Sequence, residues 1–269
     1  MDYSSSAAGR FWRGLLPVAV AGCLYVNYLY NAHPPTGALS NGAMSARHPT
    51  LLTPAGYAFS IWGVIFAGLI AYTVWQLLPA QRTAKLPQLL TPGLTLAVLA
   101  TTTWTLVFSY ELITVSLFVM LALLLLLGRA YARVRPLVLA SAGPAWPTWF
   151  LSLYLGWIML ATVLNLVFGL RDGLGWHLAK GAAVSAYTSS QLLAVAAAAI
   201  TLALAWRARD PLLPLPVAWG LLGTWRARSI DAAWGASMVG SVSFVAAVVL
   251  GLAVPLLLWR RLRPGPRVG

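Results

Sequence analysis

Charged side chains are scarce in this sequence. Only 9% of its 269 residues are Asp, Glu, Lys or Arg, whereas 60% are hydrophobic. Soluble globular domains carry about 25% charged and about 45–50% apolar residues, so water is not the main solvent of this chain. A lipid bilayer fits the composition instead. In hydrocarbon the backbone must satisfy its own hydrogen bonds, which restricts spanning segments to helices or closed barrels.

The apolar runs also lack the two-residue alternation of barrel strands, as residues 117–127 illustrate. A helix needs about 20 apolar residues to cross about 30 Å of hydrocarbon. By this criterion the sequence predicts an all-α fold, a polytopic transmembrane helical bundle with about eight spans. The expected spans are residues 14–31, 55–78, 92–109, 113–128, 148–170, 182–206, 212–225 and 236–259.

Reactive side chains are equally few. Cys23 is the only cysteine, so the chain can form neither an intramolecular disulfide nor a multi-cysteine metal site. Proton-driven transporters usually keep ionisable groups near the bilayer centre, but the carboxylates here are expected in tails or at span ends. They are Asp2, Glu111, Asp172, Asp210 and Asp231. We expect no paired acid site, and Glu111 is predicted to be a solvated turn residue.

The three histidines, His33, His48 and His177, all fall in expected loops. His33 and His48 share one loop and could meet a metal or haem iron, although lone loop histidines are usually solvated. The sequence contains no phosphate-binding glycine loop with a Lys, no nucleophile elbow and no histidine pair at helical spacing. We therefore expect no catalytic residues, no metal site and no required cofactor.

The formal net charge of +13 would suggest a nucleic-acid partner in a soluble protein. Here the Lys and Arg residues lie in loops and tails, so they bear on topology. With eight spans, 13 of the 18 basic residues fall on the side that holds both termini. The positive-inside rule then predicts cytoplasmic termini. We expect an integral protein of a bacterial inner membrane that has the lipid bilayer, and no nucleic acid, as partner.

Aromatic residues are plentiful, with 13 Trp, 10 Tyr and 8 Phe. Those at span ends fit the aromatic belts that anchor membrane helices. Trp62, Trp104 and Trp157 instead fall inside expected spans, where an indole N–H needs a partner. These residues should face the bundle interior or a cavity. Packing helices together and lining a ligand site are equal alternatives on this argument.

Three motifs point to a family, and the first two lie in the second and third expected spans. Residues 54–62, Pro-Ala-Gly-Tyr-Ala-Phe-Ser-Ile-Trp, resemble the Pro-Pro-x-Trp-x-Phe-x-x-x-Trp signature of the TspO family of tryptophan-rich sensory or translocator proteins. Tyr57 stands for the first Trp, and Trp62 comes one residue early, which rotates it about 100° around a helix. Residues 101–108 are similar to the family's Asn-x-x-Trp-Ser/Thr-x-x-Phe, with Thr101 in place of Asn and Trp104 retained.

The fifth expected span carries the most complete match. Residues 154–165 are similar to the family's Pro-Tyr-x-x-Trp-x-x-x-Ala-x-x-Leu-Asn from its Tyr onward. Tyr154, Trp157, Ala161 and Asn165 recur at helical spacing and so share one face. The resemblance covers residues 10–172, and the last three spans have no counterpart in it. We expect a five-helix TspO-like core at residues 1–172 and an additional three-helix region with a basic tail at residues 173–269.

The resemblance implies a function. It indicates a membrane sensor or binding protein for a hydrophobic planar ligand (a porphyrin or other tetrapyrrole, a sterol or an isoprenoid) in an aromatic-lined pocket. The ligand-binding residues it implies are Tyr57, Phe59, Trp62, Thr101, Trp104, Tyr154, Trp157, Ala161 and Asn165. Arg47 or His48 could pair with porphyrin propionates. The resemblance is compatible with a homodimer. A permease for an apolar small molecule and a structural factor are the alternatives.

Overall fold

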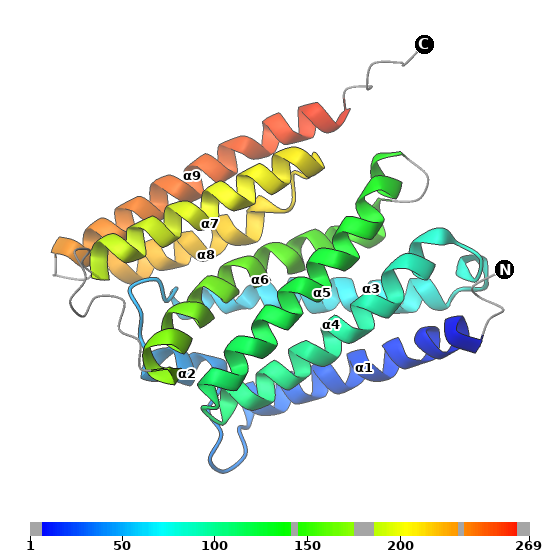
Figure 1. Ribbon diagram of the computed structural model, residues 1–269, viewed down its shortest axis with the longest axis horizontal. Helices are drawn as coiled ribbons and strands as arrows, with labels where there is room; N and C mark the ends of the chain where they lie inside the picture. The colour runs from blue at the N-terminus through cyan, green and yellow to red at the C-terminus, as the bar shows by residue number, and fades with distance from the viewer. Residues whose placement is uncertain (1–6, 141–144, 175–185, 231–233, 263–269) are drawn as a thin grey trace. The chain divides into compact units, whose positions relative to one another are not determined.

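The computed structural model describes residues 7–140, 145–174, 186–230 and 234–262 (Figure 1). Within these ranges the chain forms helices and no β-strand, which confirms the predicted all-α class. Seven helical segments of the described chain are long and apolar enough to cross a membrane. They are Ala7–Ala32, Gly56–Leu77, Lys85–Ser109, Ile113–Leu139, Trp146–Gly173, Ala186–Ala208 and Gly235–Leu262.

The residues group into two compact units that interleave along the chain. Unit 1 comprises residues 1–49, 62–151 and 165–176, and unit 2 comprises residues 50–61, 152–164 and 177–269. Helix α6 (Trp149–Phe168) contributes residues to both units. The predicted boundary between a five-helix core at residues 1–172 and a C-terminal region at residues 173–269 describes the family resemblance, and it stays a prediction. In space, residues 50–61 and 152–164 group with the C-terminal helices.

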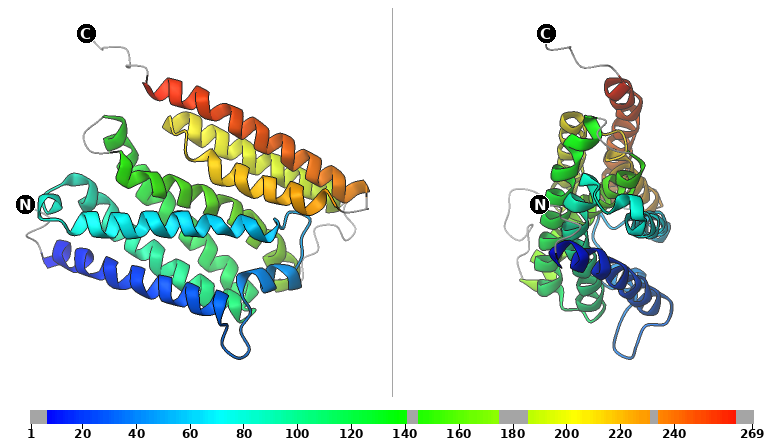
Figure 2. Two further views of the ribbon diagram at one scale, coloured as in Figure 1. Left: turned by 180° about the vertical axis from the view of Figure 1, so that it is seen from behind. Right: turned by 90° about the vertical axis from the view of Figure 1, so that its right-hand side faces the viewer.

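Unit 1 is built around α4. The long helices α1 (Ala7–Ala32) and α5 (Ile113–Leu139) both pack against α4 (Lys85–Ser109), as the two views of Figure 2 show. A Cβ at Gly93 would lie 3.3 Å from the Cβ of Ala130, so a glycine lets α4 and α5 approach closely. The unit also contains α2 (Asn41–Arg47), α3 (Ile61–Leu77), the short 3-10 helices η2 (Pro79–Gln81) and η3 (Trp146–Thr148), and the π-helix η4 (Gly169–Gly173).

Many threonine side chains of α4 bond to the backbone of their own helix. Five threonines each donate a hydrogen bond to the carbonyl four residues earlier: Thr95, Thr101, Thr102, Thr103 and Thr105. Asn27 of α1 donates to the carbonyl of Cys23 at 3.0 Å, and the Thr105 hydroxyl lies 3.5 Å from the Asn27 Oδ1. Because hydrocarbon offers no partners, this local bonding is what allows polar residues on a spanning helix.

Unit 2 contains α7 (Ala186–Ala208), α8 (Pro214–Arg228), α9 (Trp234–Leu262) and the 3-10 helix η1 (Gly56–Ser60). Helix α9 packs against both α7 and α8 (Figure 1). At one end a Cβ on Gly235 would meet the ring of Tyr187, and at the other the Arg260 guanidinium lies 3.9 Å from the Trp206 ring centroid. Helices α7 and α9 therefore run parallel.

The prediction of about eight spans is confirmed for seven. The segment expected at residues 212–225 forms α8, whose 15 residues rise only about 22 Å, less than the hydrocarbon thickness. Because α7 and α9 run in the same direction, the polypeptide between them must run back from the end of α7 to the start of α9. A short α8 with its flanking residues makes that return.

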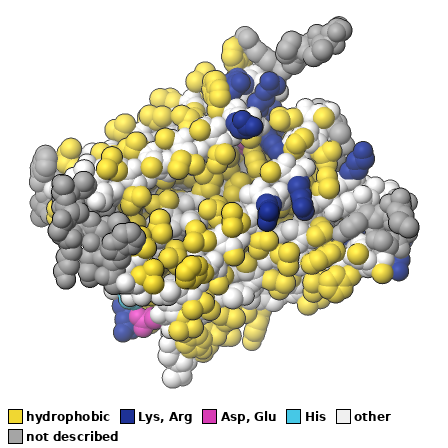
Figure 3. All heavy atoms as spheres, viewed as in Figure 1, with side chains coloured by type: hydrophobic (Ala, Val, Ile, Leu, Met, Phe, Trp, Pro, Cys, Tyr) yellow, Lys and Arg dark blue, Asp and Glu magenta, His cyan; other side chains and the backbone are white. Residues whose placement is uncertain are grey.

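On the face shown in Figure 3, hydrophobic side chains far outnumber charged ones, as a membrane protein requires.

Candidate functional site

The first cluster of predicted site residues lies in unit 1, around Trp104 on α4. Its indole N–H donates to the Asn165 Oδ1 of α6 at 3.3 Å. The hydroxyl of Ser116 lies 3.4 Å from the same oxygen and 2.8 Å from the carbonyl of Ile113, so these two acceptors compete for one proton. Trp104 and Asn165 are 6% and 3% exposed. The structure therefore provides the partner that a buried indole needs.

Trp104 is also part of an aromatic stack. Its ring stacks on Phe108, one helical turn further along α4, with centroids 4.6 Å apart and planes inclined by 17°. Phe108 in turn contacts Phe168, near the end of α6, at 5.6 Å. The residues of α4 that the motif predicted, Thr101 and Trp104, lie one turn apart on the helix, and Thr101 bonds to the carbonyl of Ala97. Three apolar rings and one amide thus form a continuous buried surface.

The second cluster lies in unit 2, where the segment that precedes α3 packs on α8. Phe59 contacts Trp157 edge to face at 6.0 Å, and both residues are among the predicted ligand-binding residues. Tyr57 contacts Trp219 at 5.1 Å, and the indole of Trp219 donates to the carbonyl of Ala58 at 3.0 Å. Sequence reasoning did not assign Trp219 to the site, although residues 216–220 carry a short Pro-x-x-Trp-Gly pattern that was the available signal.

Backbone contacts explain how α8 holds that segment. The amide of Ala55 donates to the carbonyl of Gly223 at 3.0 Å, and the Thr224 hydroxyl donates to the carbonyl of Leu52 at 2.8 Å. A Cβ at Gly223 would lie 2.8 Å from the Cβ of Pro54, so only glycine permits this approach. Helix α8 therefore supports the first of the sequence motifs.

The remaining predicted residues divide between the units. Trp62 of unit 1 stacks on Phe66 at 5.3 Å. Tyr154 of unit 2 is fully buried, and Ala161 of the same unit is half-buried. All of residues 154–165 lie in α6, which confirms the predicted helix through this motif. The structure thus brings together Trp104 with Asn165 and, separately, Phe59 with Trp157.

A third cluster lies in unit 1 and consists of charged residues. His48, which follows α2, has its Nε2 3.0 Å from a Glu111 oxygen and its Nδ1 3.0 Å from an Asp172 oxygen. Glu111 occupies the turn between α4 and α5, with a left-handed φ of 57°. Asp172 lies in η4. The imidazole of His48 therefore lies between the two carboxylates, with one ring nitrogen within hydrogen-bond distance of each.

Two arginines complete the charged cluster. Arg47 lies 3.2 Å from the same Glu111 oxygen, and Arg171 makes a bidentate contact with Asp172 at 2.6 Å. Arg171 also donates to the carbonyl of Pro49 at 2.9 Å. The prediction that Glu111 is simply solvated is wrong, because its carboxylate pairs with Arg47 and His48. Glu111 and Asp172 converge on one imidazole because the packing of α4, α5 and η4 brings the turn and the end of α6 together.

The charged cluster holds residues 47–49 against the turn between α4 and α5 and against η4, which follows α6. A shallow hollow of about 290 Å³ adjoins it, lined by Glu111–Val115, Asp172 and Gly173. The two nitrogens of His48 face different carboxylates and do not converge on one point. Among the described residues, no group of three or more His, Cys, Asp or Glu side chains could hold a metal ion. Asp2, His177 and Asp231 lie outside the described residues.

Comparison with known proteins gives one match. A model of the family described as TSPO-like protein matches residues 14–256. The matched region continues through α7 and α8 and into α9, so the C-terminal helices are part of the family pattern. No curated protein and no solved structure matches the chain at a significant level.

Proposed function

Because this chain belongs to the TSPO-like protein family, we propose that it is a membrane-embedded binding protein for a hydrophobic planar ligand. A tetrapyrrole such as a porphyrin is the first candidate, and a sterol or an isoprenoid follows. The observation that supports the proposal is the buried pair of Trp104 and Asn165 within the stack formed with Phe108 and Phe168. No catalytic step is proposed.

The chemistry of this cluster suits a flat ligand. Ring faces stack on aromatic side chains, and each well-placed pair contributes about 0.5–1.5 kcal/mol beyond area burial. Asn165 supplies an amide that orients a polar edge of the ligand, while the rings supply the apolar faces. Phe168 immediately precedes the π-helix η4, and π-helical turns frequently occur at functional sites. Movement of Phe168 away from Phe108 would open the stack to a ligand.

Phe59 and Trp157 of unit 2 form the second aromatic pair of the proposal. Arg47 and His48 belong to it less directly, since Glu111 and Asp172 already pair with them. A porphyrin propionate would have to compete with those carboxylates.

The test is a titration of the purified protein in lipid nanodiscs with protoporphyrin IX, followed through the absorbance of the porphyrin. Trp104→Phe keeps an aromatic ring but removes the indole N–H, and Trp157→Phe probes the second pair. The control is Trp149→Phe, because Trp149 is 52% exposed at the start of α6. We expect saturable binding at micromolar concentration or below, weakened about fivefold by Trp104→Phe and unchanged by the control.

Partitioning that never saturates, or that ignores both buried tryptophans, would remove the porphyrin from the proposal. Ligand flux across proteoliposomes without saturable binding would favour the permease.

We also propose a bacterial inner-membrane location with both termini in the cytoplasm, which the distribution of basic residues supports. A homodimer stays a prediction.

A further inference from the structure

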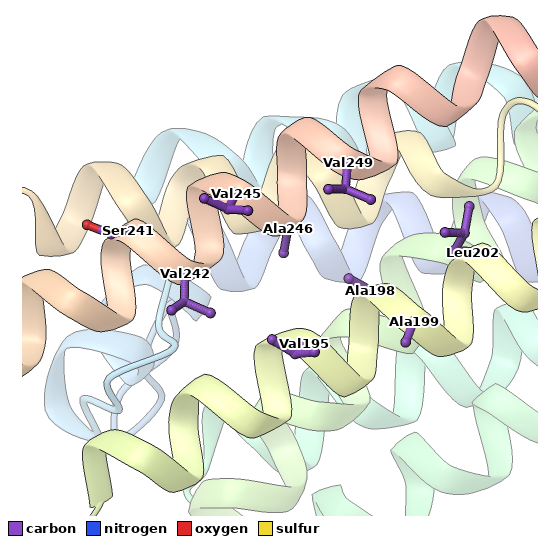
Figure 4. A pocket seen from close by; sticks show the side chains of 9 residues that line it. All are labelled: Val195, Ala198, Ala199, Leu202, Ser241, Val242, Val245, Ala246 and Val249. Atoms are coloured by element: carbon purple, nitrogen blue, oxygen red, sulfur yellow. The ribbon is translucent and has the colours of Figure 1, made fainter.

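An apolar groove runs between α7 and α9 in unit 2 (Figure 4). It encloses about 440 Å³. Alanine and valine side chains of both helices form its walls, and the lining residues are Val195, Ala198, Ala199, Leu202, Ser241, Val242, Val245, Ala246 and Val249. Ala198 and Ala246 are small enough to leave the space open. Both helices are long and apolar enough to span a membrane, so hydrocarbon is the medium that meets this groove.

Basic side chains gather at the end of the groove that lies nearest Leu202. Arg207 and Arg209 end or follow α7, and Arg260 and Arg261 lie in the last turn of α9. The Arg260 guanidinium lies over the Trp206 ring and donates to the Trp206 carbonyl at 3.1 Å. In unit 2 the described carboxylate is Asp210, which is buried and accepts hydrogen bonds from Ser152 and from the amide of Leu212.

The dimensions fit one membrane leaflet. Along α7, Leu202 lies about 6 Å from the level of Trp206 and Val195 lies about 16 Å from it. Half of the hydrocarbon thickness is about 15 Å. A lipid acyl chain that begins at the level of Trp206 and follows the groove to Val195 would therefore end near the bilayer midplane. Trp206 is also the kind of residue that marks the membrane–water interface.

We propose that this groove binds one acyl chain of an anionic phospholipid whose phosphate pairs with Arg207 and Arg260. Guanidinium groups recognise phosphate oxygens through charge-assisted hydrogen bonds, and the apolar walls accept the chain. The positive charge at this end selects an anionic headgroup over a zwitterionic one. The site is independent of the aromatic clusters described above, so the proposal does not rest on the proposed function.

The test is native mass spectrometry of the full-length protein in detergent, with phosphatidylglycerol or phosphatidylcholine added. Ala199→Phe fills the groove from an exposed position, and Arg207→Gln with Arg260→Gln removes the two guanidinium groups that the proposal pairs with the phosphate. Ala196→Phe, exposed on α7 outside the groove, is the matched control for size. Arg226→Gln, in the last turn of α8 at the other end of the unit, is the control for charge.

We expect one phosphatidylglycerol to bind about tenfold more tightly than phosphatidylcholine. The groove variant and the double arginine variant should each lower that affinity at least fivefold, and both controls should leave it within twofold. Equal binding of the two lipids, or phosphatidylglycerol binding that survives Ala199→Phe, would overturn the proposal. So would a change from dimer to monomer in Ala199→Phe without loss of lipid, since the groove would then be a subunit interface.

Discussion

Asn165 stabilises the buried indole of Trp104, and this pair sets the first prediction. Asn165→Leu leaves the indole N–H without the acceptor seen at 3.3 Å. An unsatisfied buried donor costs about 1–3 kcal/mol, so the free energy of unfolding should fall by that amount. Unfolding in mixed micelles with increasing SDS measures it. Thr103→Val is the control, because Thr103 is exposed and bonds only to its own helix. An equal loss in both variants would contradict the assignment.

His48 provides a second prediction at this scale. His48→Ala removes contacts to both Glu111 and Asp172 and leaves the two carboxylates facing each other across the vacated space. The groups are partly exposed, so the loss of stability should be only about 1 kcal/mol. The local effect should be larger: hydrogen exchange of residues 44–50 should accelerate about tenfold as the segment detaches.

Arg47→Gln is the matched control for His48. Its side chain is 61% exposed and contacts only one of the two carboxylates. We expect hydrogen exchange of the same segment to change less than threefold in this variant. If Arg47→Gln accelerated exchange as much as His48→Ala, the imidazole would not be the group that links the two helix ends.

At the scale of elements, α8 supports the segment that carries the first motif. Gly223→Ala places a Cβ 2.8 Å from the Cβ of Pro54 and 3.0 Å from that of Ala58. Overpacking of this kind costs about 1–3 kcal/mol, and the segment should shift away from α8. Equilibrium unfolding reports the energy, and the fluorescence of Trp219 reports the shift. Gly251→Ala, with nothing within 4 Å of the new Cβ, should leave both unchanged.

The packing of α8 also links the C-terminal part of the family match to the first sequence motif. Three hydrogen bonds join residues 50–61 to α8, from Ala55, Thr224 and Trp219. Without α8 the amide of Ala55 and the carbonyl of Leu52 would lose these partners. Helix α8 therefore does more than connect α7 to α9. It completes the surroundings of Tyr57 and Phe59.

For the whole molecule, the course of α8 decides the topology. If α8 crosses the membrane, residues near the end of α7 and the end of α9 share one side, and the turn after α8 lies on the other. In a Cys23→Ser background, Arg207→Cys and Arg261→Cys should react with an impermeant maleimide from the cytoplasm. Ser229→Cys should react from the opposite face. Labelling of all three from one side would show that α8 does not cross.

Much of the fold could be predicted from patterns among neighbouring residues. The hydrophobic runs located the spanning helices because hydropathy and helical period are properties of neighbouring residues. The same reasoning predicted that Trp104 needs a partner, and the motif in α6 contained that partner, Asn165. It located α8 but did not decide whether this helix crosses the membrane, since an apolar segment of 15 residues is shorter than a full span.

The sequence by itself determined the apolar character of this protein, the position of its helices and the burial of Trp62, Trp104 and Trp157. Only the tertiary structure brought His48 to Asp172, 124 residues away, and Trp219 to Ala58, 161 residues away. It likewise formed the groove between α7 and α9. Helical periodicity depends on residues close together in the sequence. The contacts of His48 with Asp172 and of Trp219 with Ala58 depend instead on which helix faces meet. Those faces meet through close approaches at Gly223 and Gly93, whose significance appears only when the helices are packed.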